Sequence, residues 1–137
     1  MSSLMLQRLV RLAYPYGRVR RVLRGPARGM RFVVAPGIGL TYAWATDTAA
    51  PRHFAKWVRP GMTVYDVGAN KGQMALLFAS LVGPGGRVVS FEPAPDEFAS
   101  LRTNIDLNGL GQVRPIQAAA AESAGESFEQ AQLCANR

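Results

Sequence analysis

The central part of the chain changes from one hydrophobic period to another at a pair of glycines. Residues 63–67 form a short β-branched run, which predicts a buried strand. Gly68 and Gly72 follow, and apolar residues then recur at the spacing of one helix face. The residues of that face are Met74, Leu77, Phe78 and Leu81. The glycine-rich run at 83–86 ends the helix, so the pattern predicts a strand, a glycine turn and a helix.

The next segment repeats this order of strand and helix. Residues 87–91 are apolar and predict a second strand, and a helix with one apolar face follows and ends at Asn108-Gly109. The residues of that face are Phe98, Leu101 and Ile105. A third strand is predicted at 113–117, where Pro115 favours an edge position. Strands that alternate with helices predict an α/β fold with a parallel sheet.

The first 59 residues follow a different pattern. Apolar positions between residues 6 and 13 predict a helix, and the runs 30–34 and 40–44 predict a β-hairpin. Thr48 and Pro51 favour the start of a short helix, with Phe54, Trp57 and Val58 on one face. We therefore divide the chain into a basic helical and hairpin segment, 1–59, and an α/β unit, 60–137.

Composition restricts the possible classes. The chain has 137 residues, enough for one domain of ordinary size, and 48% of them are hydrophobic. Cys134 is the single cysteine, so no intramolecular disulfide or cysteine-based metal site is possible, and a cytoplasmic location is expected. No apolar run approaches the roughly 20 residues that a membrane-spanning helix needs. The sequence does not indicate an oligomeric state.

The positive charge is confined to the first segment. Residues 1–59 hold ten Arg and one Lys against one acid, whereas residues 60–137 hold five basic residues against eight acids. Three interpretations are open: a basic patch for nucleic acid or an anionic membrane, a helix with a solvated arginine face, and a transit peptide. Aromatic residues are sparse among these arginines, which counts against single-stranded nucleic acid as a partner.

The glycine turn is the candidate binding site. Ligands of open α/β sheets bind beyond the carboxyl ends of the strands, and a glycine lets a ligand approach the backbone. Glu92 stands 20 residues after Gly72 (92 − 72), where an acid commonly accepts hydrogen bonds from ribose hydroxyls. Lys71 precedes Gly72, so the P-loop order is absent, and Asn70 replaces the second glycine of the dinucleotide fingerprint.

The motif Asp66-x-Gly68-x-Asn70-x-Gly72, followed by Glu92, resembles that of class I S-adenosylmethionine-dependent methyltransferases. More narrowly, Asp-Val-Gly-Ala-Asn-Lys-Gly, Phe-Glu-Pro and the helix end 104–108 resemble the FkbM family. This resemblance implies a Rossmann-like fold, S-adenosylmethionine as cofactor and methylation of a hydroxyl on a small molecule or sugar. The alternatives are a non-catalytic basic nucleic-acid-binding module and an inactive methyltransferase remnant.

The resemblance implies the cofactor-binding residues, which are Asp66, Gly68, Ala69, Asn70, Gly72 and Glu92. Asp66 is expected to orient the glycine loop or the cofactor's ammonium group, or to cap the following helix. Asn70 is expected to adopt a left-handed turn and to bond within the loop. His53 is expected at the surface or in packing. No catalytic base and no metal ligand can be assigned.

Two departures from the family pattern set further expectations. No acid directly follows the third strand, so adenine would be held by backbone groups or by Glu122. After Gln117 nothing matches the acidic motif of a fourth strand, so we expect the first three parallel strands of the fold, an N-terminal portion of such an enzyme. Alone, this chain is expected to be inactive and poorly stable. Residues 1–31 are expected to be dispensable for cofactor binding.

Overall fold

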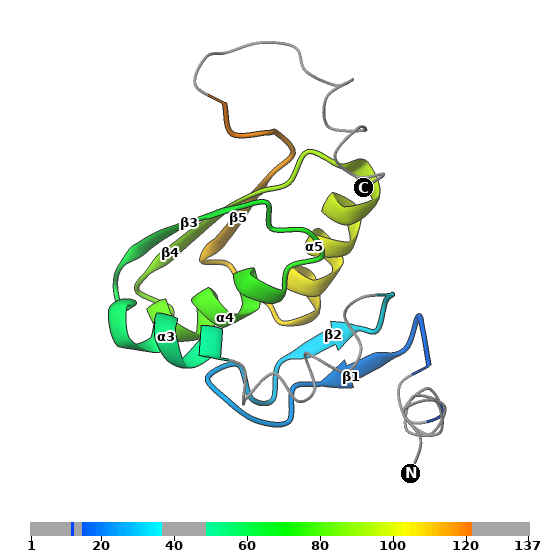
Figure 1. Cartoon of the computed structure of the whole chain (residues 1–137), viewed down its shortest axis with the longest axis horizontal. Coiled ribbons are helices and arrows are strands. Elements are labelled where there is room, and N and C mark those ends of the chain that lie inside the picture. The colour runs from blue at the N-terminus through cyan, green and yellow to red at the C-terminus, as the bar shows by residue number, and fades with distance from the viewer. Residues whose placement is uncertain (1–11, 13–14, 37–48, 122–137) are drawn as a thin grey trace.

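Strands and helices alternate through most of the structure, a computed structural model that describes residue 12, residues 15–36 and residues 49–121 (Figure 1). The elements are β1 (Val19–Arg21), β2 (Arg31–Val33), α3 (Ala49–Trp57), β3 (Thr63–Val67), α4 (Gln73–Val82), β4 (Arg87–Phe91), α5 (Pro95–Leu107) and β5 (Val113–Ile116). The predicted N-terminal helix at 6–13 and the predicted strand at 40–44 lie outside the described residues.

The three predicted parallel strands are confirmed. They form a sheet in the order β3-β4-β5, in which Val64 pairs with Val88 and Val88 with Val113. Strand β5 lies at one end of this sheet, as Pro115 indicated, because a proline cannot donate to a further neighbour. The carboxyl ends of β3 and β4 therefore lie side by side, next to the glycine turn.

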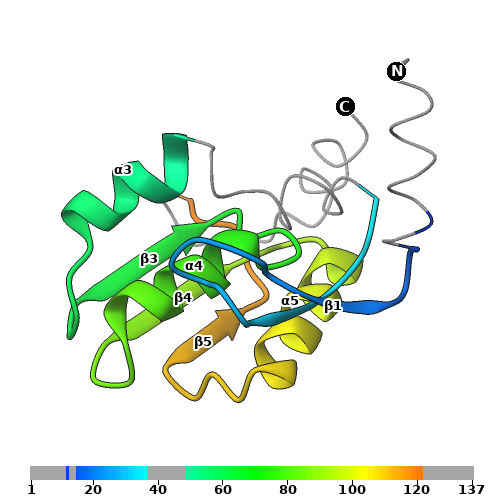
Figure 2. The same cartoon turned by 90° about the horizontal axis from the view of Figure 1, so that it is seen from below.

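Both helices of the β-α-β-α-β unit cover the same face of the sheet, as right-handed crossovers require (Figures 1 and 2). Helix α4 is buried on more sides than the predicted face implied, because it lies between the sheet, α3 and α5. Met74 and Leu81 are only partly buried. The residues of α4 that are buried are Ala75, Leu76, Leu77, Phe78, Ala79 and Val82.

A β-hairpin forms a third layer on the side of α5 that faces away from the sheet (Figures 1 and 2). The predicted strand at residues 30–34 is present as β2, but its described partner is β1, a strand that the hydrophobic pattern did not predict. Phe32 is 1% exposed and lies in one hydrophobic cluster with Leu76 and Leu101. Described residues on both sides of the expected 59/60 boundary thus contribute to one core.

Helix α3 packs against α4 through one aromatic contact. The rings of Phe54 and Phe78 meet edge to face, with centroids 5.0 Å apart. The predicted apolar face is wrong for Trp57, whose side chain is 69% exposed. Phe54 and Val58, four residues apart, make the contact with the core, so Trp57 lies outside it. His53 is exposed and lies beside Trp57.

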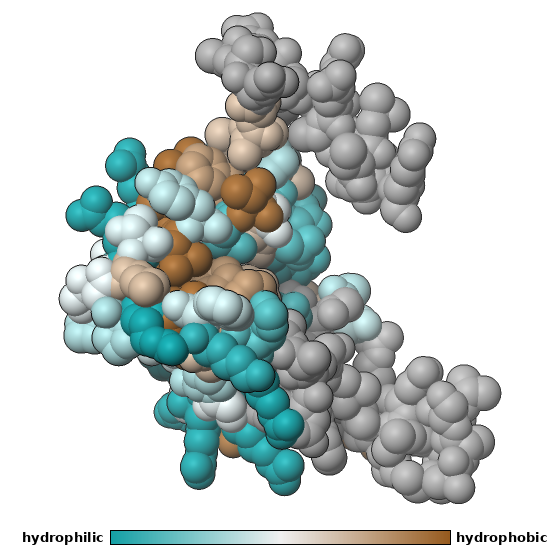
Figure 3. Space-filling model, turned by 60° about the vertical axis from the view of Figure 1, so that its left-hand side comes forward, coloured by the Kyte–Doolittle hydropathy of each residue, from teal (hydrophilic) through white to brown (hydrophobic). Residues whose placement is uncertain are grey.

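The other face of the parallel sheet carries exposed apolar side chains. Tyr65 and Val67 of β3 are 67% and 63% exposed, and Met62, just before the strand, is 44% exposed. Apolar surface gathers on this side of the molecule in Figure 3. Strand β3 has no second neighbour among the strands of the described residues. The described residues therefore leave both an apolar face and a strand edge open.

Candidate functional site

Residues 68–72, here called the glycine loop, connect β3 to α4 at the carboxyl end of the sheet. The backbone N–H groups of Gly68 and Ala69 both donate to the carbonyl of Phe91, at 2.9 Å each. Gly68 has a φ of 77°, and a Cβ placed on it would meet nothing within 4 Å. The loop is thus anchored to the end of β4, while open space remains beside Gly68.

Asn70 adopts the left-handed conformation that the motif predicted. Its φ is 50°, and no other non-glycine residue in the described part of the chain has a positive φ. Its Oδ1 accepts a hydrogen bond from the N–H of Lys71 at 2.8 Å. A short polar side chain that bonds its own loop makes this conformation accessible.

Glu92 lies beneath the glycine loop and joins it to the start of α5. Its Oε2 accepts from the N–H of Asn70 at 2.7 Å, and its Oε1 accepts from the N–H of Ala94 at 2.9 Å. The residue is 6% exposed. A carboxylate has about four acceptor positions, so each oxygen retains one for a further donor. Glu92 therefore has a structural role in addition to any contact with a ligand.

Asp66, at the end of β3, is also buried. Its Oδ2 accepts a hydrogen bond of 3.4 Å from the Ser90 hydroxyl. Burial raises the pKa of Asp66 to about 6; the Ser90 hydroxyl lowers it, and the charge of Glu92 raises it. The expectation that Asp66 caps the next helix is wrong, because α4 begins after Gly72 and has no side-chain cap.

Gly72 allows α5 to approach the loop closely. Its φ is 95°, and a Cβ placed there would lie 2.9 Å from Cδ1 of Leu101. On the same side of the loop, Nζ of Lys71 forms an ion pair of 3.5 Å with Glu97 of α5. The side chain of Lys71 is thus held by a carboxylate of its own chain.

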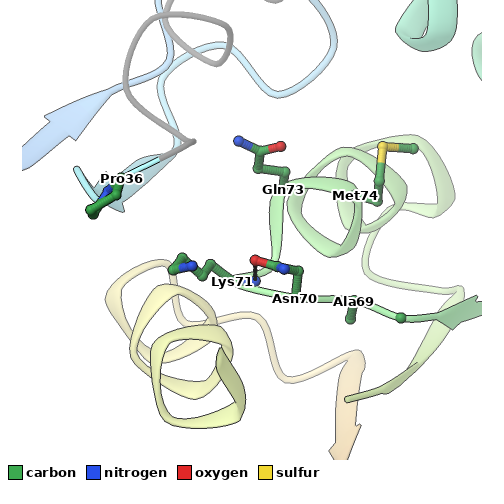
Figure 4. A pocket seen from close by; sticks show the side chains of 7 residues that line it. Pro36, Ala69, Asn70, Lys71, Gln73 and Met74 are labelled. Carbon is green, nitrogen blue, oxygen red and sulfur yellow. Dashed lines mark hydrogen bonds between the residues drawn. The ribbon is translucent and has the colours of Figure 1, made fainter. Parts of the chain in front are cut away.

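A cavity of about 400 Å³ lies against the glycine loop (Figure 4). Its lining residues are Pro36, Gly68, Ala69, Asn70, Lys71, Gln73 and Met74. Three of the six predicted site residues, Gly68, Ala69 and Asn70, line this cavity, and the other three lie outside its lining. Pro36 was not predicted, and no local sequence signal marks it. It reaches the cavity because the β1–β2 hairpin packs beside the loop.

The described residues contain neither a candidate metal site nor a candidate membrane-spanning helix. No group of three or more His, Cys, Asp or Glu side chains in this part of the chain could hold a metal ion. Among the helices of the same residues, none combines the length and the apolar character needed to cross a bilayer.

Comparison with known proteins finds its matches in the segment that contains the glycine loop. Residues 66–133 match the model of the methyltransferase FkbM domain. The chain is 54% identical over 59 residues to the 31-O-demethyl-FK506 methyltransferase FkbM of Streptomyces tacrolimicus, which covers 43% of this chain and 22% of that protein. It is 43% identical over 51 residues to a protein-L-isoaspartate O-methyltransferase of Aeropyrum pernix, covering 37% of this chain and 20% of that protein.

The solved structures support the fold. A hypothetical protein of Thermus thermophilus superimposes with a TM-score of 0.50 at 23% identity, over 73% of this chain and 56% of that one. The matched part of this chain spans about a fifth of the length of the curated relatives. On these matches and on the sheet with its glycine loop, residues 66–133 of the chain are a methyltransferase FkbM domain with the fold of class I S-adenosylmethionine-dependent methyltransferases.

Proposed function

We propose that this chain binds S-adenosylmethionine against the glycine loop and serves the O-methylation of a hydroxyl group on a small molecule or sugar. The observation that carries the proposal is the pairing of an open loop with a buried carboxylate. Gly68, Ala69 and Asn70 line a cavity, and Glu92 supports the loop from below. Cavities of 300–1,000 Å³ are typical of sites for small molecules and cofactors.

The residues at this cavity fit such a cofactor. The open space beside Gly68 allows a ligand to lie against the backbone. Glu92 retains acceptor capacity for the hydroxyls of a ribose, and Asp66 adds a second carboxylate near the end of β3. The loop side chains carry no group typical of a pyrophosphate site, because Lys71 is already paired with Glu97.

When bound, S-adenosylmethionine supplies an electrophilic methyl group on a sulfonium. The residues of this chain then bind and orient: the glycine loop fixes one side of the cavity, and Pro36 closes part of another. Orientation of this kind contributes much of the rate enhancement of a reaction in which two groups must meet in line. No described residue is assigned as a general base.

Calorimetric titration of the 137-residue chain with S-adenosylhomocysteine, the demethylated product, tests the cofactor site. We expect saturable binding with one site per chain. S-adenosylmethionine with an isotopically labelled methyl group and a panel of hydroxylated, amine and carboxylate acceptors then tests the reaction class. Absence of saturable binding would overturn the cofactor assignment, and labelled product from amines or carboxylates alone would overturn the hydroxyl assignment.

A further inference from the structure

Asn104, in the middle of α5, connects two parts of the molecule that are far apart in sequence. The residue is 2% exposed. Its Oδ1 accepts from the N–H of Val33 in β2 at 2.8 Å, and its Nδ2 donates to the carbonyl of Lys71 in the glycine loop at 2.8 Å. A single buried amide therefore joins the N-terminal hairpin to the loop that lines the cavity.

Asn108, one helical turn later, bonds the same strand. Its Oδ1 accepts from the N–H of Arg31 at 2.6 Å, and its Nδ2 donates to the carbonyls of Arg31 and Asn104, each at 2.7 Å. Four residues span about 6 Å along a helix, and two residues span about 6.6 Å along a strand. The side-chain amides of Asn104 and Asn108 are therefore spaced like the N–H groups of Val33 and Arg31 in β2. These bonds of Asn108 go to β2 and α5 and not to the glycine loop, which distinguishes it from Asn104.

The position of the Lys71 carbonyl matters because its neighbours line the cavity. The N–H groups of residues 68–71 donate to the end of β4, to Glu92 and to the Asn70 side chain. The Lys71 carbonyl is held by Asn104, which is in turn held by β2. Three residues after β2 ends, the chain reaches Pro36, which lies on the opposite side of the cavity from Gln73 (Figure 4). Both walls of the cavity are thus tied to one side chain.

We propose that Asn104 is a positioning residue of the cofactor site, which couples the β1–β2 hairpin to the glycine loop. The proposal rests on the proposed function, since it concerns the affinity of the same cavity for S-adenosylmethionine. It makes the N-terminal hairpin a part of the cofactor site, in contrast to the expectation that residues 1–31 are dispensable for binding.

The test compares Asn104→Ala with Asn108→Ala in the 137-residue chain, by titration with S-adenosylhomocysteine below the unfolding transition of each variant. Both substitutions release bonds to β2 from the same helix, but only the first releases the loop. We expect Asn104→Ala to weaken binding about tenfold, the factor for one buried hydrogen bond, and Asn108→Ala to change it less than about twofold. Equal losses in both variants would overturn the proposal, because general loosening of the hairpin would then explain them.

Amide hydrogen exchange without ligand gives a second readout. We expect faster exchange at residues 70–72 in Asn104→Ala, and exchange like that of the parent chain at these positions in Asn108→Ala. If the parent chain binds no S-adenosylhomocysteine, the proposed function fails, and the exchange comparison still decides the role of Asn104. Unchanged exchange in the loop would overturn it. If Asn104→Ala does not fold, the smaller change Asn104→Ser is measured in the same way.

Discussion

At the scale of single residues, Asp66 gives the molecule a pH-dependent stability. Burial raises its pKa from 3.8 to about 6, so the folded chain binds more protons than the unfolded chain between these values. The contribution of Asp66 to the free energy of unfolding therefore falls as the pH rises from about 4 to 6, and is constant above that range.

We accordingly predict that Asp66→Asn stabilises the chain at pH 7 by about 2–3 kcal/mol and that this gain shrinks toward pH 4. Denaturant unfolding at a series of pH values measures the difference. Asp106→Asn, at an exposed position of α5, makes the same chemical change and serves as the control. A gain from Asp66→Asn that is constant between pH 4 and 7 would contradict the prediction.

Glu92 allows a prediction that separates its two roles. Glu92→Ala removes the acceptor for the N–H groups of Asn70 and Ala94 and the acceptor proposed for ribose. We predict that S-adenosylhomocysteine binds more weakly to this variant by about 1–3 kcal/mol. An analogue without the ribose hydroxyls should lose less, because it has no such bond to lose. Equal losses for both ligands in calorimetry would mean that Glu92 acts through the loop alone.

The residues of the glycine loop show what local chemistry allows one to predict. The left-handed turn at Asn70 and its internal hydrogen bond follow from the short polar side chain between two glycines. The cap assigned to Asp66 was wrong because Ser90, on the neighbouring strand, provides a partner that the local sequence does not reveal. The sequence identifies Asn104 only as part of a helix end, since its partners lie 71 and 33 residues away.

At the scale of elements, the contact between the glycine loop and α5 depends on the absence of one side chain. We predict that Gly72→Ala destabilises the chain by about 2–4 kcal/mol, because the new Cβ meets Leu101 in a backbone conformation that L-residues rarely adopt. Gly68→Ala, with a similar φ but open space, should cost about 1–2 kcal/mol. Denaturant unfolding compares the two, and equal costs would show that the contact with Leu101 relaxes freely.

The β1–β2 hairpin offers a second test of element packing. Phe32→Ala is predicted to cost about 3–5 kcal/mol, since the ring is 1% exposed within the core. Val19→Ala, at a 43% exposed position of β1, should change stability by less than about 0.5 kcal/mol. Thermal unfolding followed by circular dichroism measures both variants. A Phe32→Ala variant as stable as the parent would mean that the hairpin is not part of the core.

Elements with a long, regular pattern were predictable, and those fixed by distant contacts were not. Strands β3, β4 and β5 and helices α4 and α5 carry apolar periods strong enough to place them. Strand β1 has three residues, two of them arginine, so it has almost no pattern of its own. It forms because β2 is held against α5 and offers its other edge for pairing. Such a strand follows from tertiary contacts rather than from local sequence.

At the scale of the whole molecule, the described residues leave the second face of the parallel sheet uncovered. Parallel strands are ordinarily buried on both faces, and an open strand edge pairs readily with another chain. We predict that the 137-residue chain self-associates as its concentration rises, and that Tyr65→Lys with Val67→Lys reduces this association.

Sedimentation velocity over a range of concentrations measures that effect. Trp57→Lys is the matched control, because Trp57 is equally exposed but lies on α3, away from the sheet face. A chain that stays monomeric throughout, or one in which Trp57→Lys acts as strongly as the β3 changes, would contradict the prediction.

Strands β2 and β3 each have an edge without a neighbouring strand among the described residues, and the asparagine pair of α5 makes the two edges different. Strand β2 directs the N–H groups of Arg31 and Val33 away from β1, where they would otherwise form a template for a further strand. The side-chain oxygens of Asn104 and Asn108 accept hydrogen bonds from those two N–H groups, so helix α5 takes the place of a neighbouring strand. This substitute fits one register only: a shift of β2 by one residue would present Phe32 to the amides and turn its ring out of the core.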